Sequence, residues 1–381
     1  MNKNLRLIVF FLFFFSVFGG INYYVIIRGR QAIPEEFFPD YLFFPLLIFL
    51  SLAFVFSVMF EKIIHYKILA FMELLGGTWM IYLLYFFVMA IFGDLFRLLD
   101  YFFAVFPDSF YENYDLVKLA YLLTLILLLI VFSIIGNRKF RKTEIVHKKI
   151  SIDSKKSTLN KIRIVAVSDV HLGDLINVRS LRRFVEQINN LNADIILIAG
   201  DLFDRNLQSV ERQGMTDVLK TLEAKNGVYG ILGNHEYIGN VNKAVELIEK
   251  AGIKLLRDSY FEIEGTICIV GRDDFTNKKR KTIKLILENS NNELPKILLD
   301  HQPVNLSEAV ENQIDLQISG HTHNGQIYPI NHIVSLIYKL GYGYKKIGNT
   351  HFYVSSGLGI WGAPIRIGTQ SEIVCFDLEL K

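Results

Sequence analysis

Polar residues that can bind metal ions follow five short apolar segments in the second half of this sequence. The segments run over 162–167, 194–199, 228–232, 296–299 and 316–319, and their aliphatic and β-branched residues are typical of buried strands. The polar residues after them are Asp169, His171, Asp201, Asn234, His301, His321 and His323. Carboxylate, amide and imidazole groups in this mixture suit divalent ions such as Mn, Fe or Zn. The residue types therefore predict a metal centre.

The elements that must position these residues indicate an α/β fold. Stretches with helical spacing separate the apolar segments; in Arg179–Leu191, for example, Leu181 and Phe184 fall on one face. Alternating strands and helices predict helices layered on a sheet. Ligands of such sheets bind beyond the carboxyl ends of the strands, so we expect the metal-binding residues to meet at one edge. A motif such as His321-X-His323 is weak alone, and the prediction depends on the whole ordered set.

The ordered motifs resemble the calcineurin-like metallophosphoesterase superfamily. They are Asp169-X-His171, Gly200-Asp201-X-X-Asp204, Gly233-Asn234-His235-Glu236, His301 and Gly320-His321-X-His323. The segment 355–359, followed by Pro364-Ile365-Arg366, resembles the membrane-associated bacterial subgroup that includes YkuE and YaeI. The resemblance covers nearly all of residues 161–378. It implies a four-layer α/β/β/α sandwich with two divalent metal ions near the strand ends.

The resemblance also implies how the ligands are shared between the two metals. The first metal is held by Asp169, His171, Asp201 and His323. Asp201 bridges to the second metal, which is completed by Asn234, His301 and His321. In such a centre a water between the metals becomes a hydroxide that attacks phosphorus in line. The expected activity is therefore hydrolysis of phosphodiester, phosphomonoester or pyrophosphate bonds.

Four further residues are expected to support this chemistry. His235 resembles the family's second-sphere histidine and is a candidate general acid for the leaving oxygen. Asp204 would orient that histidine by accepting its other ring proton. Arg205 is a candidate bidentate phosphate contact, with an ordinary surface arginine as the equal alternative. For Glu236 we favour a structural role, capping a helix that follows Gly239.

Three glycines each precede a predicted metal ligand. They are Gly200, Gly233 and Gly320. The absence of a side chain lets the backbone turn tightly beside the metals, so we expect close packing at these positions.

The first half of the sequence predicts a membrane region. The chain has 381 residues, and its 51% hydrophobic content and 31 phenylalanines are concentrated before residue 136. Four apolar runs are long enough to cross a bilayer, at about Leu7–Ile27, Tyr41–Phe60, Leu74–Gly93 and Leu119–Ile135. We therefore divide the chain into a transmembrane region at 1–136, a basic linker at 137–160 and a metallophosphoesterase domain at 161–381.

The charges beside the runs predict the orientation. Basic residues flank the N-terminus, the second loop and the end of the fourth run, whereas the third loop is acidic, with Asp94 and Asp100 among its residues. The excess of Lys and Arg places both ends in the cytoplasm, although Arg28 and Arg30 in the first loop oppose this. We expect a multi-pass protein of a bacterial cell membrane with a cytoplasmic catalytic domain.

Composition also bears on partners. A formal net charge of +3 is too small to indicate nucleic-acid binding, so a nuclease is a weaker alternative. A membrane sensor or receptor that uses the domain for ligand binding is another. The membrane region favours lipids as partners and a phosphoester or pyrophosphate substrate that is lipid-linked or a nucleotide-lipid. Cys268 and Cys375 lie in apolar segments and are expected to be buried free thiols. The oligomeric state is not predicted.

Overall fold

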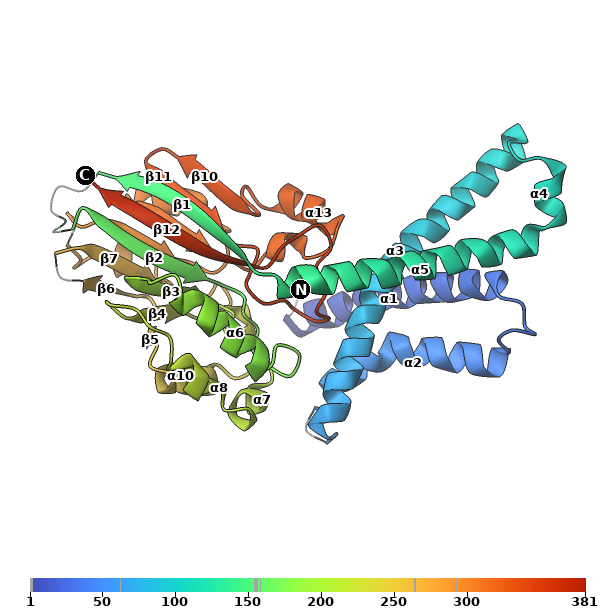
Figure 1. The fold of residues 1–381 in the computed structure, drawn as a ribbon, viewed down its shortest axis with the longest axis horizontal. Coiled ribbons are helices and arrows are strands. Elements are labelled where there is room, and N and C mark those ends of the chain that lie inside the picture. The colour runs from blue at the N-terminus through green and yellow to red at the C-terminus, as the bar shows by residue number, and fades with distance from the viewer. Residues whose placement is uncertain (1–2, 62, 154–156, 158, 264, 292) are drawn as a thin grey trace. The chain divides into compact units, whose positions relative to one another are not determined.

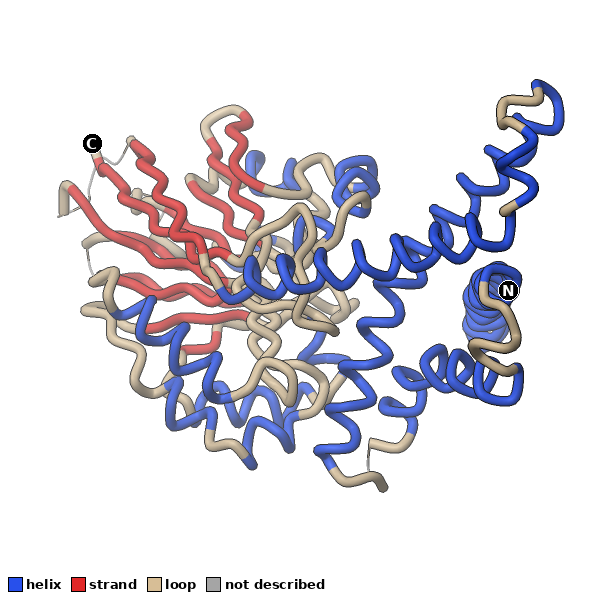
Figure 2. Tube along the Cα trace, turned by 45° about the vertical axis from the view of Figure 1, so that its right-hand side comes forward, coloured by secondary structure: helices blue, strands red, loops and turns tan. Residues whose placement is uncertain are grey.

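The structure is a computed structural model that describes the chain except residues 1–2, 62, 154–156, 158, 264 and 292. The chain forms two compact units, Met1–Ile134 and Ile135–Lys381. Figure 2 shows that the first unit is helical, whereas the strands lie in the second.

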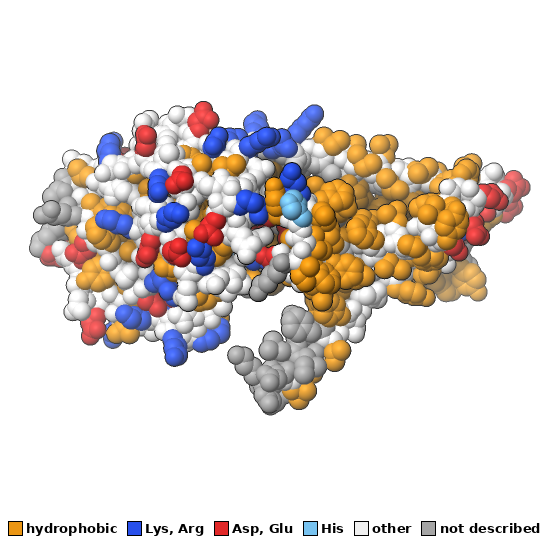
Figure 3. Space-filling view, turned by 90° about the horizontal axis from the view of Figure 1, so that it is seen from below, with side chains coloured by type: hydrophobic (Ala, Val, Ile, Leu, Met, Phe, Trp, Pro, Cys, Tyr) orange, Lys and Arg blue, Asp and Glu red, His pale blue; other side chains and the backbone are white. Residues whose placement is uncertain are grey.

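Among its described residues, the first unit contains four helices long and apolar enough to cross a membrane. The helices are α1 Lys3–Ala32, α2 Asp40–Met59, α3 Tyr66–Phe103 and α5 Tyr114–Arg141, with the short α4 Asp108–Glu112 before α5. Large apolar side chains on them are exposed, including Phe13 and Tyr101, and hydrophobic residues cover this unit in Figure 3. Exposed apolar surface of this extent suits contact with lipid rather than water. The expectation of four apolar helices is confirmed.

The position of two acidic residues differs from the sequence prediction. Asp94 and Asp100 lie within α3 and not in a loop, because this helix runs for 38 residues and passes well beyond the expected span. Asp94 accepts a hydrogen bond from the Tyr24 hydroxyl at 2.6 Å and pairs with Arg28 at 2.6 Å. Arg30 pairs with Asp40. The two arginines that opposed the predicted orientation are therefore in ion pairs with acidic residues of the same unit.

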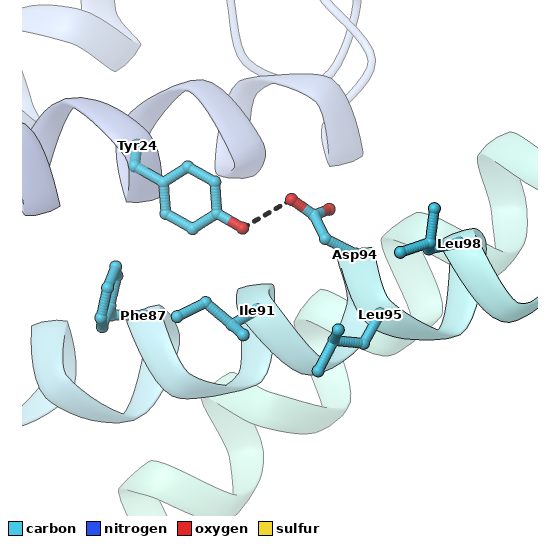
Figure 4. Close-up of a pocket in the computed structure, with 6 residues that line it drawn as sticks. All are labelled: Tyr24, Phe87, Ile91, Asp94, Leu95 and Leu98. Carbon is cyan, nitrogen blue, oxygen red and sulfur yellow. Dashed lines mark hydrogen bonds between the residues drawn. The ribbon is translucent and has the colours of Figure 1, made fainter.

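Two cavities lie in the helical unit. One has a volume of about 430 Å³ and is lined mainly by apolar residues beside the Tyr24–Asp94 hydrogen bond (Figure 4). The other has a volume of about 990 Å³ and is bordered by Arg28, Arg97 and Lys118, each of which pairs with an aspartate. The predicted metal ligands line neither cavity.

The second unit contains two six-stranded sheets. The first has the order β1 Glu144–Ile152, β12 Glu372–Leu380, β2 Lys161–Val167, β3 Ile195–Ala199, β4 Val228–Ile231 and β5 Lys254–Leu255. The second has the order β10 Gly343–Ile347, β11 Thr350–Val354, β9 Leu316–Ser319, β8 Lys296–Leu299, β7 Ile267–Gly271 and β6 Ser259–Ile263. Strands β2 to β5 are parallel, as are β7, β8, β9 and β11, so each sheet has several carboxyl ends at one edge.

Helices cover the outer faces of both sheets, which gives four layers (Figure 1). Apolar residues of both sheets pack together between them, among them Leu197 and Ile297. The first sheet is covered by α6 Val178–Asn189, α7 Leu207–Arg212, α8 Met215–Leu219 and α10 Val241–Lys250. The second is covered by α11 Ile283–Ile286 and α12 Leu306–Glu311. The predicted α/β/β/α sandwich is confirmed, and Cys268 and Cys375 are buried free thiols as expected.

The segment expected as a linker is mostly ordered structure. Residues 137–141 continue α5, and Glu144–Ile152 forms β1, which pairs in parallel with β12. Ile150 and Ile152 of this edge strand are buried, whereas Lys149 and Ser151 on its opposite face are exposed. The strand could not be recognised from the sequence, because an edge strand buries only one face and carries polar residues on the other. Residues 154–156 and 158 of the expected linker lie outside the described residues.

Candidate metal centre

The predicted ligands converge from the carboxyl ends of strands in both sheets. Asp169 and His171 follow β2, Asp201 follows β3, and Asn234 begins the short helix α9 (Asn234–Ile238) after β4. From the second sheet, His301 follows β8, and His321 and His323 follow β9, with His323 starting the turn η1 (His323–Gly325). Residues that are far apart in the sequence therefore meet because parallel strands end at the same edges.

Five of these residues have a left-handed backbone. Asp169, His171, Asp201, His321 and His323 have φ between 50° and 71°. This conformation is unfavourable for residues with a Cβ atom, and such strain tends to occur at functional sites. The backbone is thus held in a conformation that aims these side chains at a common point.

One group of donor atoms is formed by Asp169, His171 and His323. The Nε2 atoms of His171 and His323 lie 3.0 Å apart, and His323 Nε2 lies 3.6 Å from Asp169 Oδ1. All three residues are almost completely buried. Two imidazole nitrogens facing a carboxylate in a buried space offer lone pairs to a cation.

A second group surrounds Asn234 and His301. Asn234 Oδ1 lies 2.8 Å from His321 Nδ1 and 3.2 Å from His301 Nε2. Asp201 connects the two groups, since its Oδ2 lies 3.2 Å from His301 Nε2 and 3.8 Å from His171 Nε2. The backbone N–H of His235 donates to Asp201 Oδ1 at 2.8 Å. Asp201 therefore lies between the two groups of donor atoms.

The donor set fits divalent metal ions. Atoms of Asp169, His171 and His323 lie within 4.8 Å of one another, as do those of Asp169, Asp201 and His301. Burial, helped by the neighbouring His235, lowers the pKa of His171 to about 3, and burial lowers the pKa of His323 well below its usual value. These imidazoles are therefore neutral, as metal ligation requires.

His235 and Asp204 form a pair beside these groups. His235 Nδ1 lies 2.9 Å from Asp204 Oδ1, and its ring packs edge-on to His171 at 4.5 Å. Burial lowers the pKa of His235, but the hydrogen bond to Asp204 and the charge of Asp201 raise it by more, so the net pKa lies above its usual value. The structure thus places Asp204 where the sequence predicted an orienting carboxylate.

Comparison with known proteins identifies the family. A family model described as "Calcineurin-like phosphoesterase" matches residues 162–325. The chain is 30% identical over 226 residues to "Uncharacterized metallophosphoesterase YkuE" of Bacillus subtilis, covering 57% of this chain and 79% of that protein. The chain belongs to the calcineurin-like phosphoesterase family.

Two other relatives of the calcineurin-like family extend the comparison. An "Uncharacterized metallophosphoesterase" of Helicobacter pylori is 34% identical over 224 residues, which is 57% of this chain and 60% of the relative. A "Transmembrane protein with metallophosphoesterase domain" of Danio rerio is 32% identical over 246 residues, which is 60% of this chain and 56% of the relative. The chain thus spans less than two thirds of both relatives. Their similarity, with the four apolar helices, supports membrane association.

The glycines of the family motifs are required for two different reasons. Gly200 has φ of +87°, a left-handed conformation, and a Cβ atom there would lie 2.6 Å from the His301 ring. A Cβ atom at Gly320 would lie 2.1 Å from Asp169 Oδ2, and one at Gly233 would lie 2.2 Å from Asp201 Oδ1. The expectation of close packing at all three is confirmed, whereas positive φ is found only at Gly200.

Glu236 has a larger structural role than the sequence indicated. Its carboxylate accepts hydrogen bonds from the backbone N–H groups of Gly233 at 2.7 Å, Phe203 at 2.9 Å and Asp201 at 3.2 Å. The helix it caps is α9, which starts at Asn234, and not a helix after Gly239 as expected. Burial, together with the charge of Asp201, raises the pKa of Glu236 to about 7. Glu236 therefore joins the loops that carry Asp201 and Asn234.

Arg366, part of the quoted subgroup motif, supports the other side of the centre. It is completely buried, and its Nη2 donates to the carbonyl oxygens of Gly359 at 2.5 Å, Ser356 at 2.8 Å and Gly357 at 2.9 Å. Gly359 N–H in turn donates to the Asp169 carbonyl oxygen at 2.9 Å. The motif could be read from the sequence but this role could not, because the acceptors are backbone atoms. Arg366 therefore stabilises the 356–359 loop, whose Gly359 N–H donates to the Asp169 carbonyl oxygen.

The structure leaves the role of Arg205 as a prediction. Its backbone N–H donates to Asp204 Oδ1 at 2.9 Å, and its side chain is half-buried next to the His235–Asp204 pair. This position is compatible with contact to a substrate phosphate.

Proposed function

We propose that this protein is a phosphoesterase that depends on two divalent metal ions. The observation that carries the proposal is the convergence of seven predicted ligands, five of them with strained left-handed backbones, around the carboxylate of Asp201. A structural polar cluster would not require strain at so many positions. The residues fit Mn, Fe or Zn equally, since carboxylate, amide and imidazole groups accept all three.

The ligands divide into two sets around Asp201. Asp169, His171 and His323 would hold one ion, and Asn234, His301 and His321 the other. Two such ions supply Lewis acidity toward the phosphoryl oxygens and a strong nucleophile near neutral pH. Asp201 would contribute to both sets, and its own backbone N–H donates to the carboxylate of Glu236, an interaction we call the Glu236 clamp.

His235 would donate a proton to the leaving oxygen. Its Nδ1 is occupied by Asp204, so Nε2 is the ring nitrogen available to a substrate. The raised pKa keeps the imidazolium populated near neutral pH, which a general acid requires. Arg205 would contact the phosphate as a planar guanidinium.

The membrane helices support a proposal for the substrate class. We propose a lipid-linked phosphoester or pyrophosphate, or a nucleotide-lipid, which a catalytic domain tethered to a membrane meets at high local concentration. The unit Met1–Ile134 would cross a bacterial membrane several times with the catalytic unit in the cytoplasm.

The activity can be tested with soluble chromogenic esters. The full chain, purified in detergent, is assayed with Mn²⁺ on bis-p-nitrophenyl phosphate and on p-nitrophenyl phosphate, with Asp201→Asn as the control. We expect hydrolysis that chelator and Asp201→Asn both abolish, and the ratio of the two rates separates diesterase from monoesterase. Hydrolysis that survives both treatments would contradict the proposal.

A further inference from the structure

The helix that follows the last predicted metal ligands exposes its apolar side. Helix α13, labelled in Figure 1, covers Ile330–Ile337 and begins seven residues after His323. Its residues Ile333, Leu336 and Ile337 are 53%, 86% and 68% exposed. Spacings of three and four residues place these side chains on one face of the helix. An exposed face of this kind is the reverse of the pattern in a helix that packs onto a soluble core.

A second exposed apolar residue is attached to the same metal loop. Trp361 is 43% exposed. Its carbonyl oxygen accepts a hydrogen bond from Gln326 Nε2 at 2.9 Å, and its N–H donates to Gln326 Oε1 at 3.2 Å. Since Gln326 lies three residues after His323, both apolar elements are fixed to the loop that carries metal ligands.

Residues that follow the C-terminal end of α13 contact the loop that carries His321 and His323. The Thr322 hydroxyl donates to the Gly341 carbonyl oxygen at 2.5 Å. The ring of Tyr338, directly after α13, lies 6.3 Å from the ring of His321 in an edge-on arrangement. Any surface that holds α13 is therefore held close to the predicted second metal.

The charged side chains of this part of the sequence are all basic. The sequence contains no Asp or Glu between Asp315 and Glu372. Lys339, Lys345 and Lys346 are exposed in this stretch. Lysines beside a membrane attract anionic lipid headgroups, and tryptophan is enriched where protein meets the bilayer surface.

We propose that Ile333, Leu336, Ile337, Trp361 and Lys339 form a docking face that lies in the headgroup region of an anionic bilayer. The apolar side chains enter the boundary between headgroups and acyl chains, as in amphipathic helices that lie on membranes. The four apolar helices of the same chain favour a bilayer over a soluble partner, because they keep the protein at a membrane. The docking face would bring the phosphoester of a membrane lipid to the metal loop, and this last step rests on the proposed function.

Fluorescence quenching in the full chain tests the docking. Leu336→Cys is labelled with a nitrobenzoxadiazole dye and reconstituted in nanodiscs that contain lipids with nitroxide-labelled acyl chains. The native cysteines are completely buried, so the label reports on the new position. The matched control is Leu285→Cys on α11, which is 52% exposed but lies outside the docking face.

We expect lipid nitroxides to quench the Leu336→Cys label at least twofold more than the Leu285→Cys label. The difference should grow when phosphatidylglycerol replaces phosphatidylcholine, and should shrink in a background of Lys339→Gln, which removes the lysine two residues after the end of α13. Equal quenching at both positions would overturn the proposal. A Leu336→Cys label shielded from aqueous iodide but not quenched by lipid would also overturn it, in favour of a protein partner or a second copy of the chain.

A kinetic comparison separates docking from catalysis. The variant Leu336→Gln with Ile337→Gln should hydrolyse soluble bis-p-nitrophenyl phosphate within twofold of the wild-type rate. On an umbelliferyl phosphodiester of diacylglycerol in phosphatidylglycerol vesicles, it should be at least tenfold slower. Equal rates of variant and wild type on the vesicles would contradict the docking face. If the wild type hydrolyses neither compound with Mn²⁺, the proposed function fails, whereas the quenching still decides the docking.

Discussion

The Nδ1 atom of His235 lies 2.9 Å from Oδ1 of Asp204, at the edge of a cluster of buried metal-binding side chains. The carboxylate fixes which ring nitrogen remains for the substrate and raises the pKa of the imidazole against the effect of burial. Neither residue is among the seven predicted ligands, so the proposed proton donor is distinct from the proposed metal ligands.

Asp204→Asn should move the basic limb of the pH–rate profile to lower pH. Loss of the carboxylate lowers the pKa of His235, so the protonated form required for general acid catalysis is lost at a lower pH. We expect about a tenfold loss of kcat at pH 8 and a smaller loss at pH 6, from profiles with bis-p-nitrophenyl phosphate. Asp217→Asn, which removes an exposed carboxylate paired with Lys220, should leave the profile unchanged. Parallel profiles for wild type and Asp204→Asn would refute the assignment.

Glu236→Ala should destabilise the catalytic unit. The change leaves three buried N–H groups without their acceptor, each costing about 1–3 kcal/mol. Thermal unfolding in detergent, with chelator present so that metal makes no contribution, should show a clear fall in Tm. Glu236→Gln keeps an acceptor oxygen and should lose less, and Glu223→Ala at an exposed position should have little effect. A Tm for Glu236→Ala equal to that of Glu223→Ala would rule out the clamp.

Gly320→Ala should remove metal without unfolding the protein. A methyl group there would lie 2.1 Å from Asp169 Oδ2, so the carboxylate must leave its position. Gly173→Ala is the matched control, because its methyl group would meet Asp204 Cβ at an ordinary 3.5 Å. Metal content after gel filtration should fall by about one ion per chain in the first variant only. Full metal content in Gly320→Ala would contradict the geometry of the site.

Arg366→Met should be more destabilising than an ordinary surface change. It removes the donor to three buried carbonyl oxygens, which we expect to cost roughly 3 kcal/mol or more. Burial lowers the pKa of Arg366 to about 10, so the side chain remains charged at neutral pH and its donors are retained. Thermal unfolding compares this variant with Arg179→Met, an exposed arginine on α6. Equal Tm values would show that the loop holds its shape without Arg366.

Much of the fold could be predicted because the buried strands are short and consist almost entirely of apolar residues. The segments 296–299 and 316–319 coincide with β8 and β9, and the helix expected at 179–191 is α6, Val178–Asn189. The metal-binding residues could be placed because each follows such a strand. Their capacity to bind metal depends on the type of side chain, which can be read directly from the sequence.

The features that could not be predicted depend on contacts between residues far apart in the sequence. The clamp by Glu236 and the support by Arg366 both use backbone groups as partners, and any residue type supplies those. Strand β1 was missed because exposed polar residues such as Lys149 alternate with its buried residues, and its pairing with β12 is not visible in the sequence. Helix α3 continues past its apolar run through Asp94, which pairs with Arg28, 66 positions earlier, and with Arg97 of the same helix.

Counting metal ions against activity tests the central claim most directly. Purified wild-type protein is loaded with Mn²⁺, freed of excess metal and measured for metal per chain and for hydrolysis of bis-p-nitrophenyl phosphate, beside Asp201→Asn. We predict about two ions per chain in the active wild type, and at most one ion with a loss of activity of at least about a thousandfold in the variant. Hydrolysis by metal-free protein, or by Asp201→Asn at the wild-type rate, would contradict a two-metal phosphoesterase.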